Sequence, residues 1–233
     1  MNMENSKLLM VAAAHPDDPE FGSGGTVAKM IGEGWQAIYV ICTKGDKGTS
    51  DLNMTSEKLA EIRVREQRNA AAVLGVNEVV FLGHPDGFLK DEPVFRGELV
   101  KLIRKYRPAL VITHDPFRKY VWHHDHRVTG LVCMDAVYPC SRDRLFYPEH
   151  ISEGLMIHKV REVYLTNPEE PNRFIDIGNS FILKMKAISC HVSQVGDHTS
   201  DWEKWVDEQR KPAVDGQLGS RVIEAFHRIE IMP

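Results

Sequence analysis

The sequence predicts an α/β protein built on a doubly wound, mostly parallel sheet. Three observations predict this fold class. Short apolar runs bounded by turn residues recur along the chain, helical patterns separate the first four of them, and a polar cluster follows each of these four runs. Strands that alternate with helices form parallel sheets, and the loops after such strands gather at one edge.

The individual elements follow from the same patterns. Apolar runs predict strands buried on both faces, at residues 8–14, 37–42, 79–82, 109–113 and 163–166. Helical patterns between the first four strands cover residues 23–33, 56–74 and 95–106. The helix over 56–74 has the clearest ends, because it starts at a serine, has acidic residues in its first turn and stops before Gly75.

The chain is expected to form a single domain over residues 1–233. It contains no internal repeat, low-complexity tract or linker rich in Pro, Gly and Ser. The predicted helix and strand core covers about residues 7–140. Residues from about 141 to 233 are predicted to form a loop-rich extension with some β structure, and its irregular part at 140–180 would wall a site at the sheet edge.

The composition argues against several classes of protein. Apolar residues make up 42% of the chain and charged residues 27%, as in ordinary soluble domains, and no apolar run reaches the roughly 18 residues of a membrane span. The net charge of -4 comes without a basic patch, so nucleic acid is not an expected partner. The four cysteines have neither metal-site nor disulfide spacing, and no secretory signal is recognised. We expect a cytoplasmic protein that acts on a small molecule and binds neither nucleic acid nor a membrane.

The first polar cluster is His15, Pro16, Asp17 and Asp18, directly after the first predicted strand. Pro16 turns the chain off the strand, so the imidazole and the carboxylates emerge together at the sheet edge. Imidazole and carboxylate are the usual non-thiol ligands of zinc, and two ligands are expected from this cluster. Taken alone, the cluster fits equally well an Asx-type turn that caps a helix. The glycine-rich segment at 22–25 lacks the spacing of a dinucleotide-binding loop.

The second polar cluster, VWHHDHR at 121–127, holds three histidines and a carboxylate in four consecutive positions. Packing explains such a cluster poorly, because each buried polar group needs a partner, and exposure without a role is the main alternative. The cluster lies in the loop after the strand at 109–113 and opens a helical pattern, so it faces the same sheet edge as the first cluster. The convergence of the two clusters predicts a site for a divalent metal, most simply zinc.

A hydrolytic metal site also needs a base and a donor to the developing oxyanion. If Asp18 binds the metal, Asp17 can take the proton of the metal-activated water and pass it to the leaving amine. His123, if protonated and held by Asp125, would stabilise the oxyanion. Either Asp17 or His123 could instead orient a metal ligand.

Other basic residues are assigned more ordinary roles. His84 and His114 follow the third and fourth strands and are expected to form turns rather than to bind metal. Arg63 and Arg65 lie on the helix at 56–74, where a solvated face is the default. His191 follows a helical run and is expected to be a core or surface histidine.

With these residues in place, the sequence resembles the PIG-L-type (LmbE-like) zinc-dependent N-deacetylases from the first strand to about residue 230. The segments that carry the resemblance are AHPDDPEFGSGGT at 14–26, the Arg63-x-x-Glu66 helix, HHDHR at 123–127, KAISCHVSQ at 186–194 and EAFHR at 224–228. The sequence departs from the family pattern at two positions, because Pro19 stands where many members have Glu and His124 stands where Pro is usual. Glu20 supplies the acidic group, and the spacing of the second cluster is intact. The fold implied is Rossmann-like, in agreement with the predicted sheet.

The resemblance also implies roles for individual residues. The implied metal ligands are His15, Asp18 and His126, and the implied general base is Asp17. His123 with Asp125 would be the acid beside the oxyanion, while Arg63 and His191 would line the substrate pocket. One Zn²⁺ per chain is expected, with other divalent cations compatible. Family members often form trimers or hexamers, so a homo-oligomer is expected.

We therefore expect a hydrolase that removes the N-acetyl group from an N-acetylglucosamine-containing conjugate. Two alternatives stay open: a metal-dependent amidohydrolase with a non-sugar amide, and a protein that binds metal and sugar without turnover. A dinucleotide-binding oxidoreductase is a remote third. Loops near 44–54, 115–122 and 140–160 are expected to choose the substrate, with Tyr120 and Trp122 as candidates to stack on a sugar ring.

Overall fold

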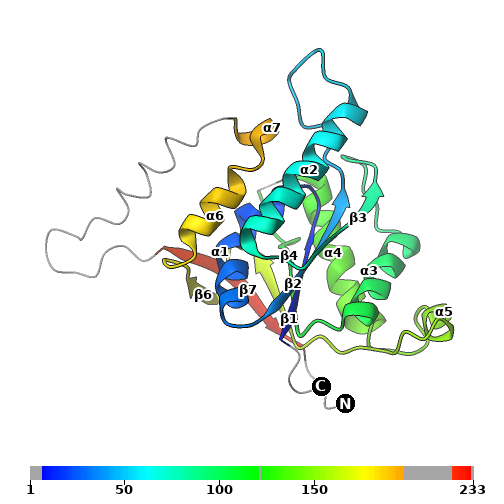
Figure 1. Cartoon of the computed structure of the whole chain (residues 1–233). Helices are drawn as coiled ribbons and strands as arrows, with labels where there is room; N and C mark the ends of the chain where they lie inside the picture. Colours follow the sequence, from blue (N-terminus) through cyan, green and yellow to red (C-terminus); the bar gives the residue numbers. More distant parts are fainter. Residues whose placement is uncertain (1–6, 121, 197–221, 232–233) are drawn as a thin grey trace, which may run out of the picture.

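The computed structural model describes residues 7–120, 122–196 and 222–231. Within these residues, seven strands form one sheet in the order β3-β2-β1-β4-β5-β7-β6 (Figure 1). Their bounds are Leu8–Ala13 (β1), Gln36–Thr43 (β2), Glu78–His84 (β3), Leu110–His114 (β4), Glu162–Thr166 (β5), Arg173–Asp176 (β6) and Ile223–Glu230 (β7). The strands β1 to β5 pair in parallel, and β7 is antiparallel to both β5 and β6. The predicted α/β fold with a mostly parallel sheet is confirmed.

Helices cover both faces of the sheet, as the doubly wound prediction requires. They are α1 (Asp18–Gly32), α2 (Ser56–Leu74), α3 (Pro93–Tyr106), α4 (His124–Asp135), α5 (Pro148–Ser152), α6 (Phe181–Ile188) and α7 (Val192–Val195), with a π-helical turn at Ala136–Cys140 after α4. Figure 1 shows α1, α2 and α6 on one face and α3 and α4 on the other. Each face has its own apolar core, one with Val27 and Leu74 and the other with Leu99 and Val132. Because β1 and β2 are buried on both faces, their sequences are continuously apolar.

The strand order creates a crevice beside β1. The chain runs outward from β1 to β2 and β3, and then crosses to the other side of β1 to form β4. At such a switch point the loops after the two central strands diverge, and ligands bind in the crevice between them. The first polar cluster follows β1 and the second follows β4, so both lie at this point of the sheet.

Both polar clusters form helix starts, as predicted for the second cluster but not for the first. The helix predicted over 23–33 begins at Asp18, with Pro19 in its first turn, where proline is tolerated. The glycine-rich segment at 22–25 lies inside this helix and serves close packing, since a Cβ on Gly25 would lie 2.4 Å from a methyl carbon of Ile177. Helix α4 likewise begins at His124, inside the second cluster.

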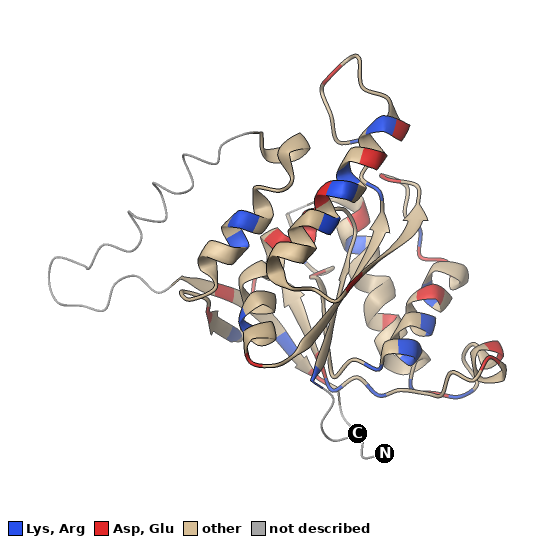
Figure 2. Cartoon of the chain, viewed as in Figure 1, with Lys and Arg blue, Asp and Glu red and all other residues tan. Residues whose placement is uncertain are grey.

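The C-terminal extension adds strands to the main sheet. Strands β5, β6 and β7 continue it beyond β4, and α6 and α7 pack beside α1 and α2 (Figure 1). Residues 197–221 of this extension lie outside the described part of the chain. Figure 2 shows Lys and Arg interspersed with Asp and Glu on the covering helices. In the described ranges, every helix is too short or too polar to cross a membrane.

Candidate metal centre and active site

Three residues at the crevice place donor atoms at the spacing of ligands around a tetrahedral ion, Asp18 with one oxygen toward each of the other two residues. His15 Nδ1 lies 3.3 Å from Asp18 Oδ2 and 3.3 Å from His126 Nε2. Asp18 Oδ1 lies 3.1 Å from His126 Nε2. Ligand atoms about 2.0–2.1 Å from a tetrahedral Zn²⁺ are about 3.3 Å apart, so these three residues fit such an ion. The sheet thus brings together residues from the start of α1 and the start of α4.

The His15 ring is oriented by two carboxylates on its far side. Its Nε2 lies 3.1 Å from Asp86 Oδ1 and 3.2 Å from Asp125 Oδ2. Because a carboxylate only accepts, Nε2 carries a proton, and Nδ1 faces the donor cluster, where it offers a lone pair to a metal ion once its own proton is lost. Burial alone would lower the pKa of His15, but the carboxylates of Asp125, Asp18 and Asp86 outweigh it and raise the pKa to about 11. The donor set therefore favours a positive charge at this position.

The partner of Asp125 differs from the sequence expectation. Its carboxylate is fully buried and accepts hydrogen bonds from the backbone N–H groups of Gly87, at 2.7 Å, and Leu89, at 3.2 Å, besides its contact with His15. Asp125 thus holds a candidate metal ligand instead of His123. The first turn of α4 directs its side chain toward the loop after β3, which adjacency in the sequence does not reveal.

His123 lies exposed above the donor cluster. Its ring stacks on His126 with centroids 4.4 Å apart and meets His15 edge-on at 4.6 Å. Burial, followed by the neighbouring His126 and His15, lowers the pKa of His123. The structure therefore does not support the expected protonated His123 held by Asp125. A neutral imidazole still offers one N–H donor to an oxyanion.

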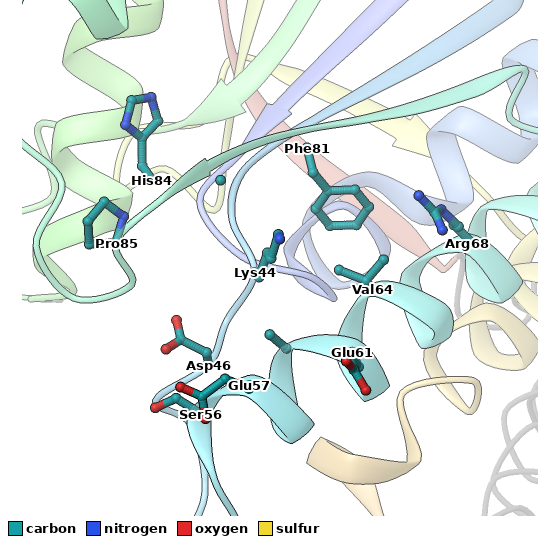
Figure 3. A pocket seen from close by; sticks show the side chains of 12 residues that line it. Lys44, Asp46, Ser56, Glu57, Glu61, Val64, Arg68, Phe81, His84 and Pro85 are labelled. Atoms are coloured by element: carbon teal, nitrogen blue, oxygen red, sulfur yellow. The ribbon is translucent and has the colours of Figure 1, made fainter.

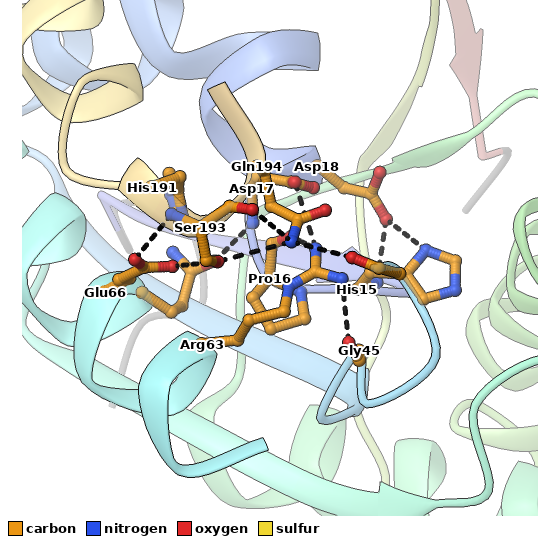
Figure 4. Close-up of polar contacts among 12 residues, drawn as sticks. His15, Pro16, Asp17, Asp18, Gly45, Arg63, Glu66, His191, Ser193 and Gln194 are labelled. Carbon is orange, nitrogen blue, oxygen red and sulfur yellow. Dashed lines mark hydrogen bonds and ion pairs between the residues drawn. The ribbon is translucent and has the colours of Figure 1, made fainter. Parts of the chain in front are cut away.

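Asp17 sits beside the donor cluster in an unusual backbone conformation. Its φ is +90°, a region that residues other than glycine rarely adopt. Its Oδ2 accepts a hydrogen bond from Arg63 Nη2 at 3.0 Å (Figure 4). Burial and the neighbouring Asp18 raise the pKa of Asp17 to about 7, against the opposing effect of Arg63. A carboxylate with a pKa near 7 suits general acid and base chemistry at neutral pH.

Arg63 and His191 lie in the interior behind Asp17. Arg63 is 4% exposed and also donates to the carbonyl oxygens of Gly45, at 2.9 Å, and Pro16, at 2.6 Å (Figure 4). The expectation of a solvated face is wrong for Arg63. His191 is fully buried, with Nε2 3.2 Å from Glu20 Oε2. Both side chains are therefore buried, and the groups that they contact belong to the protein interior.

The sequence reading missed three residues at this site. Asp86 contacts His15, and Gln67 contacts the backbone of Asp17. His114, expected to form a turn, stacks on His126 with centroids 4.0 Å apart, and its Nε2 lies 3.3 Å from Asp18 Oδ2. Asp18, His114 and His126 could hold a metal ion, as could His15, His123 and His126, or His15, Asp86 and Asp125. The position of His114 at the carboxyl end of β4, beside the switch point, was the available signal.

A groove of about 700 Å³ lies between α2 and the carboxyl ends of β2 and β3 (Figure 3). Its floor includes Phe81, and Lys44, Asp46 and Arg68 are among the charged residues around it. Lys44 and Asp46 flank Gly45, whose carbonyl oxygen binds Arg63. The loop that begins at residue 44 therefore borders both this groove and the surroundings of Asp17.

Comparison with known proteins agrees with this geometry. The PIG-L family model, described as GlcNAc-PI de-N-acetylase, matches residues 10–137, which include both polar clusters. The chain belongs to the PIG-L family. A diacetylchitobiose deacetylase from Thermococcus kodakarensis is 33% identical over 199 residues, which are 85% of this chain and 73% of that protein.

Two further relatives extend the comparison over most of this PIG-L family chain. A 1D-myo-inositol 2-acetamido-2-deoxy-alpha-D-glucopyranoside deacetylase from Actinosynnema mirum is 27% identical over 242 residues, covering 84% of this chain and 83% of that protein. The solved structure of an N,N'-diacetylchitobiose deacetylase from Pyrococcus horikoshii, in complex with an inhibitor, matches with a TM-score of 0.84 and 32% identity. That match covers 99% of this chain and 88% of the other.

Proposed function

We propose that this protein is a divalent-metal-dependent N-deacetylase that removes the acetyl group from an N-acetylglucosamine-containing conjugate. The observation that carries the proposal is the spacing of His15, Asp18 and His126, with Asp17 beside them. Its family membership and its deacetylase relatives support the reaction and the sugar substrate. Zinc as the native metal, a cytoplasmic location and assembly as a homo-oligomer are part of the proposal.

The residues of this chain have distinct tasks in the proposed reaction. A divalent cation held by His15, Asp18 and His126 supplies Lewis acidity and lowers the pKa of water. Asp17 accepts the proton of the attacking water at Oδ1, because Arg63 binds Oδ2. As water adds to the acetyl carbon, His123 donates its N–H to the acetyl oxygen. Asp17 then gives the proton to the nitrogen as the C–N bond breaks, leaving a free amine and acetate.

The proposal is tested by measuring amine and acetate released by zinc-loaded protein. The panel contains N,N'-diacetylchitobiose, an acetamido-deoxyglucosyl inositol and an N-acetylated amino acid. We expect equal amounts of amine and acetate from a sugar substrate. Asp17→Asn should lower kcat by roughly a hundred- to ten-thousandfold with unchanged metal content, because the amide keeps the shape of the carboxylate but does not take the proton.

Each other outcome contradicts a defined part of the proposal. Release from the amino acid alone would assign a non-sugar amidohydrolase. An Asp17→Asn variant as active as the wild type would remove Asp17 as the base. Protein that holds one metal per chain and hydrolyses nothing in the panel would count against the deacetylase function.

A further inference from the structure

A buried chain of hydrogen bonds runs behind Asp17 through groups that the proposed reaction does not use. The Asp17 backbone N–H donates to Gln67 Oε1 at 2.9 Å, and Gln67 Nε2 donates to Glu20 Oε1 at 2.9 Å. Glu20 Oε2 in turn lies 3.2 Å from His191 Nε2. Gln67, Glu20 and His191 are all fully buried, so substrate does not reach them.

The two partners of the Gln67 side-chain amide both fix which way the amide points. The backbone N–H of Asp17 only donates, so it must face the amide oxygen. The carboxylate accepts, so it must face the amide nitrogen. Gln67 therefore joins two groups that no apolar side chain of its size can satisfy together. Losing it would leave a buried N–H and a buried carboxylate oxygen without this partner.

A second residue on the same face of α2, Arg63, also contacts Asp17. Arg63 and Gln67 are four positions apart, and side chains at this spacing lie on one face of a helix. Arg63 binds the Pro16 carbonyl and the Asp17 carboxylate, while Gln67 binds the Asp17 N–H. Both residues thus hold the peptide group that precedes the Asp17 Cα, and Arg63 also holds the Asp17 side chain, so rotation about the N–Cα bond between them is restricted from one rigid helix. This explains how a φ of +90° persists at a residue that is not glycine.

We propose that Gln67, supported by Glu20 and His191, is a positioning residue that holds the left-handed backbone of Asp17 and thereby aims its carboxylate. The proposal rests on the proposed function for the role of Asp17, but the backbone contact is independent of it. It also gives His191 a task in the interior instead of in substrate binding. Because catalysis depends on near-attack geometry, a displaced carboxylate should slow the reaction without weakening substrate binding.

The test compares Gln67→Met with the matched control Gln36→Met in the zinc-loaded full chain. Gln36 is exposed at the start of β2, at the opposite end of the sheet. We measure kcat and KM per bound metal with the best substrate of the panel, and amide hydrogen exchange by NMR. We expect Gln67→Met to lower kcat by about ten- to a hundredfold, with KM within about threefold. Exchange of the Asp17 amide should accelerate by at least about tenfold while the β1 amides stay protected.

The result is decisive in either direction. An unchanged kcat, or an Asp17 amide as protected as in the wild type, would overturn the proposal. Gln67→Glu combined with Glu20→Gln keeps an oxygen for the Asp17 amide and a donor and an acceptor between positions 67 and 20. Its kcat should therefore exceed that of Gln67→Met, and an equal loss in both would also contradict the proposal. This second variant carries the test if Gln67→Met does not fold. If wild-type protein hydrolyses nothing, the proposed function fails while the exchange measurement still decides the role of Gln67.

Discussion

The His15 ring shows how single residues prepare the candidate metal centre. Asp86 and Asp125 both contact Nε2, so the ring orientation that points Nδ1 at the other ligands is fixed before any ion binds. Asp125 is itself fixed by the backbone N–H groups of Gly87 and Leu89. Both carboxylates lie at Nε2, whereas Asp18 and His126 lie at Nδ1. Their effect should therefore be on affinity for the metal.

We predict that Asp125→Asn lowers the affinity for Zn²⁺ by about ten- to a hundredfold, and that Asp86→Asn acts in the same direction. Both Asp125 oxygens accept from N–H groups, so the amide nitrogen of the variant must face a donor, either at His15 and Gly87 or at Leu89, and the support of the His15 ring is weakened. Competition with a chromophoric chelator measures the affinity. The control is Asp51→Asn on the exposed loop after β2. Unchanged affinity in both variants would show that the carboxylates do not orient His15.

A second residue of interest is Trp122, which is 76% exposed but held in place. Its indole N–H donates to the Lys119 carbonyl at 2.9 Å, and the Arg127 guanidinium lies 5.4 Å from the ring centroid. A ring that is already ordered loses little entropy when a sugar stacks on it. We predict that Trp122→Ala raises KM for a disaccharide substrate by roughly three- to tenfold with little change in kcat. Phe174→Ala, an exposed aromatic residue on β6, is the control, and equal KM values in both variants would contradict the stacking role.

Residues of the candidate site could be predicted where several polar side chains stand close together in the sequence. His15, Asp17 and Asp18 stand within four positions, and the structure brings them close to His126. Asp86, His114 and Gln67 were missed because each finds its partner only through the fold. The pairing of Asp125 with His123 followed adjacency in the sequence, whereas the helix start turns the two side chains in different directions. Distant contacts of this kind leave no local pattern.

At the scale of elements, helix α1 depends on an ion pair from the C-terminal part of the chain. The Glu224 carboxylate on β7 accepts from the backbone N–H groups of Gly25, at 3.0 Å, and Thr26, at 2.7 Å. Lys184 on α6 donates to Glu224 at 2.6 Å and to the Phe21 carbonyl at 2.9 Å. The buried pair thus joins α6 and β7 to the glycine-rich part of α1, one turn beyond the residues of the metal centre.

We predict that Glu224→Ala lowers the free energy of unfolding by about 3–5 kcal/mol, because the ammonium of Lys184 and two backbone N–H groups lose a buried partner. The double variant Glu224→Leu with Lys184→Met should lose less, since it removes both charges together. Urea unfolding of metal-free protein measures both changes. A double variant that is destabilised as much as Glu224→Ala, or more, would argue against coupling.

Helices and strands were predictable where residues close in the sequence determine their ends. Helix α2 has the predicted bounds, because Thr55 accepts from the Lys58 N–H at one end and Gly75 adopts φ +82° at the other. The start of α1 was placed too late, because the helix already begins at Asp18 in the first polar cluster, and within it Gly25 allows close contact with Ile177. The short strand β6 is half exposed and has no apolar pattern of its own, so only pairing with β7 defines it.

For the whole molecule, the alternation of strands and helices predicted the parallel part of the sheet but not its continuation. Strand β7, at the end of the described chain, inserts between β5 and β6 in the antiparallel direction. The position of β7 depends on which edge of the sheet is left open after the core has formed, and no repeating pattern of apolar residues in the sequence encodes it.

The stability of the whole molecule also depends on segments that cross between layers. His158 is one such point, because its Nε2–H donates to the Pro108 carbonyl at 2.7 Å and its backbone N–H donates to Ser141.

The fold should lose stability on acidification through His158. Burial lowers the pKa of His158 below its ordinary value, against the Pro108 hydrogen bond and with the help of Arg107 and Arg161. Below about pH 6.5 the unfolded chain therefore binds a proton that the folded chain does not, so stability present above this pH is lost as pH falls toward the folded pKa. We predict that urea unfolding of metal-free His158→Gln, whose amide can still donate to Pro108, shows a smaller loss of stability between pH 7.5 and 5.5 than the wild type. His150 has a pKa lowered in the same direction and is unchanged in the variant, so the difference isolates His158. Equal pH dependence in the two proteins would mean that His158 is protonated in the folded state as readily as in the unfolded one.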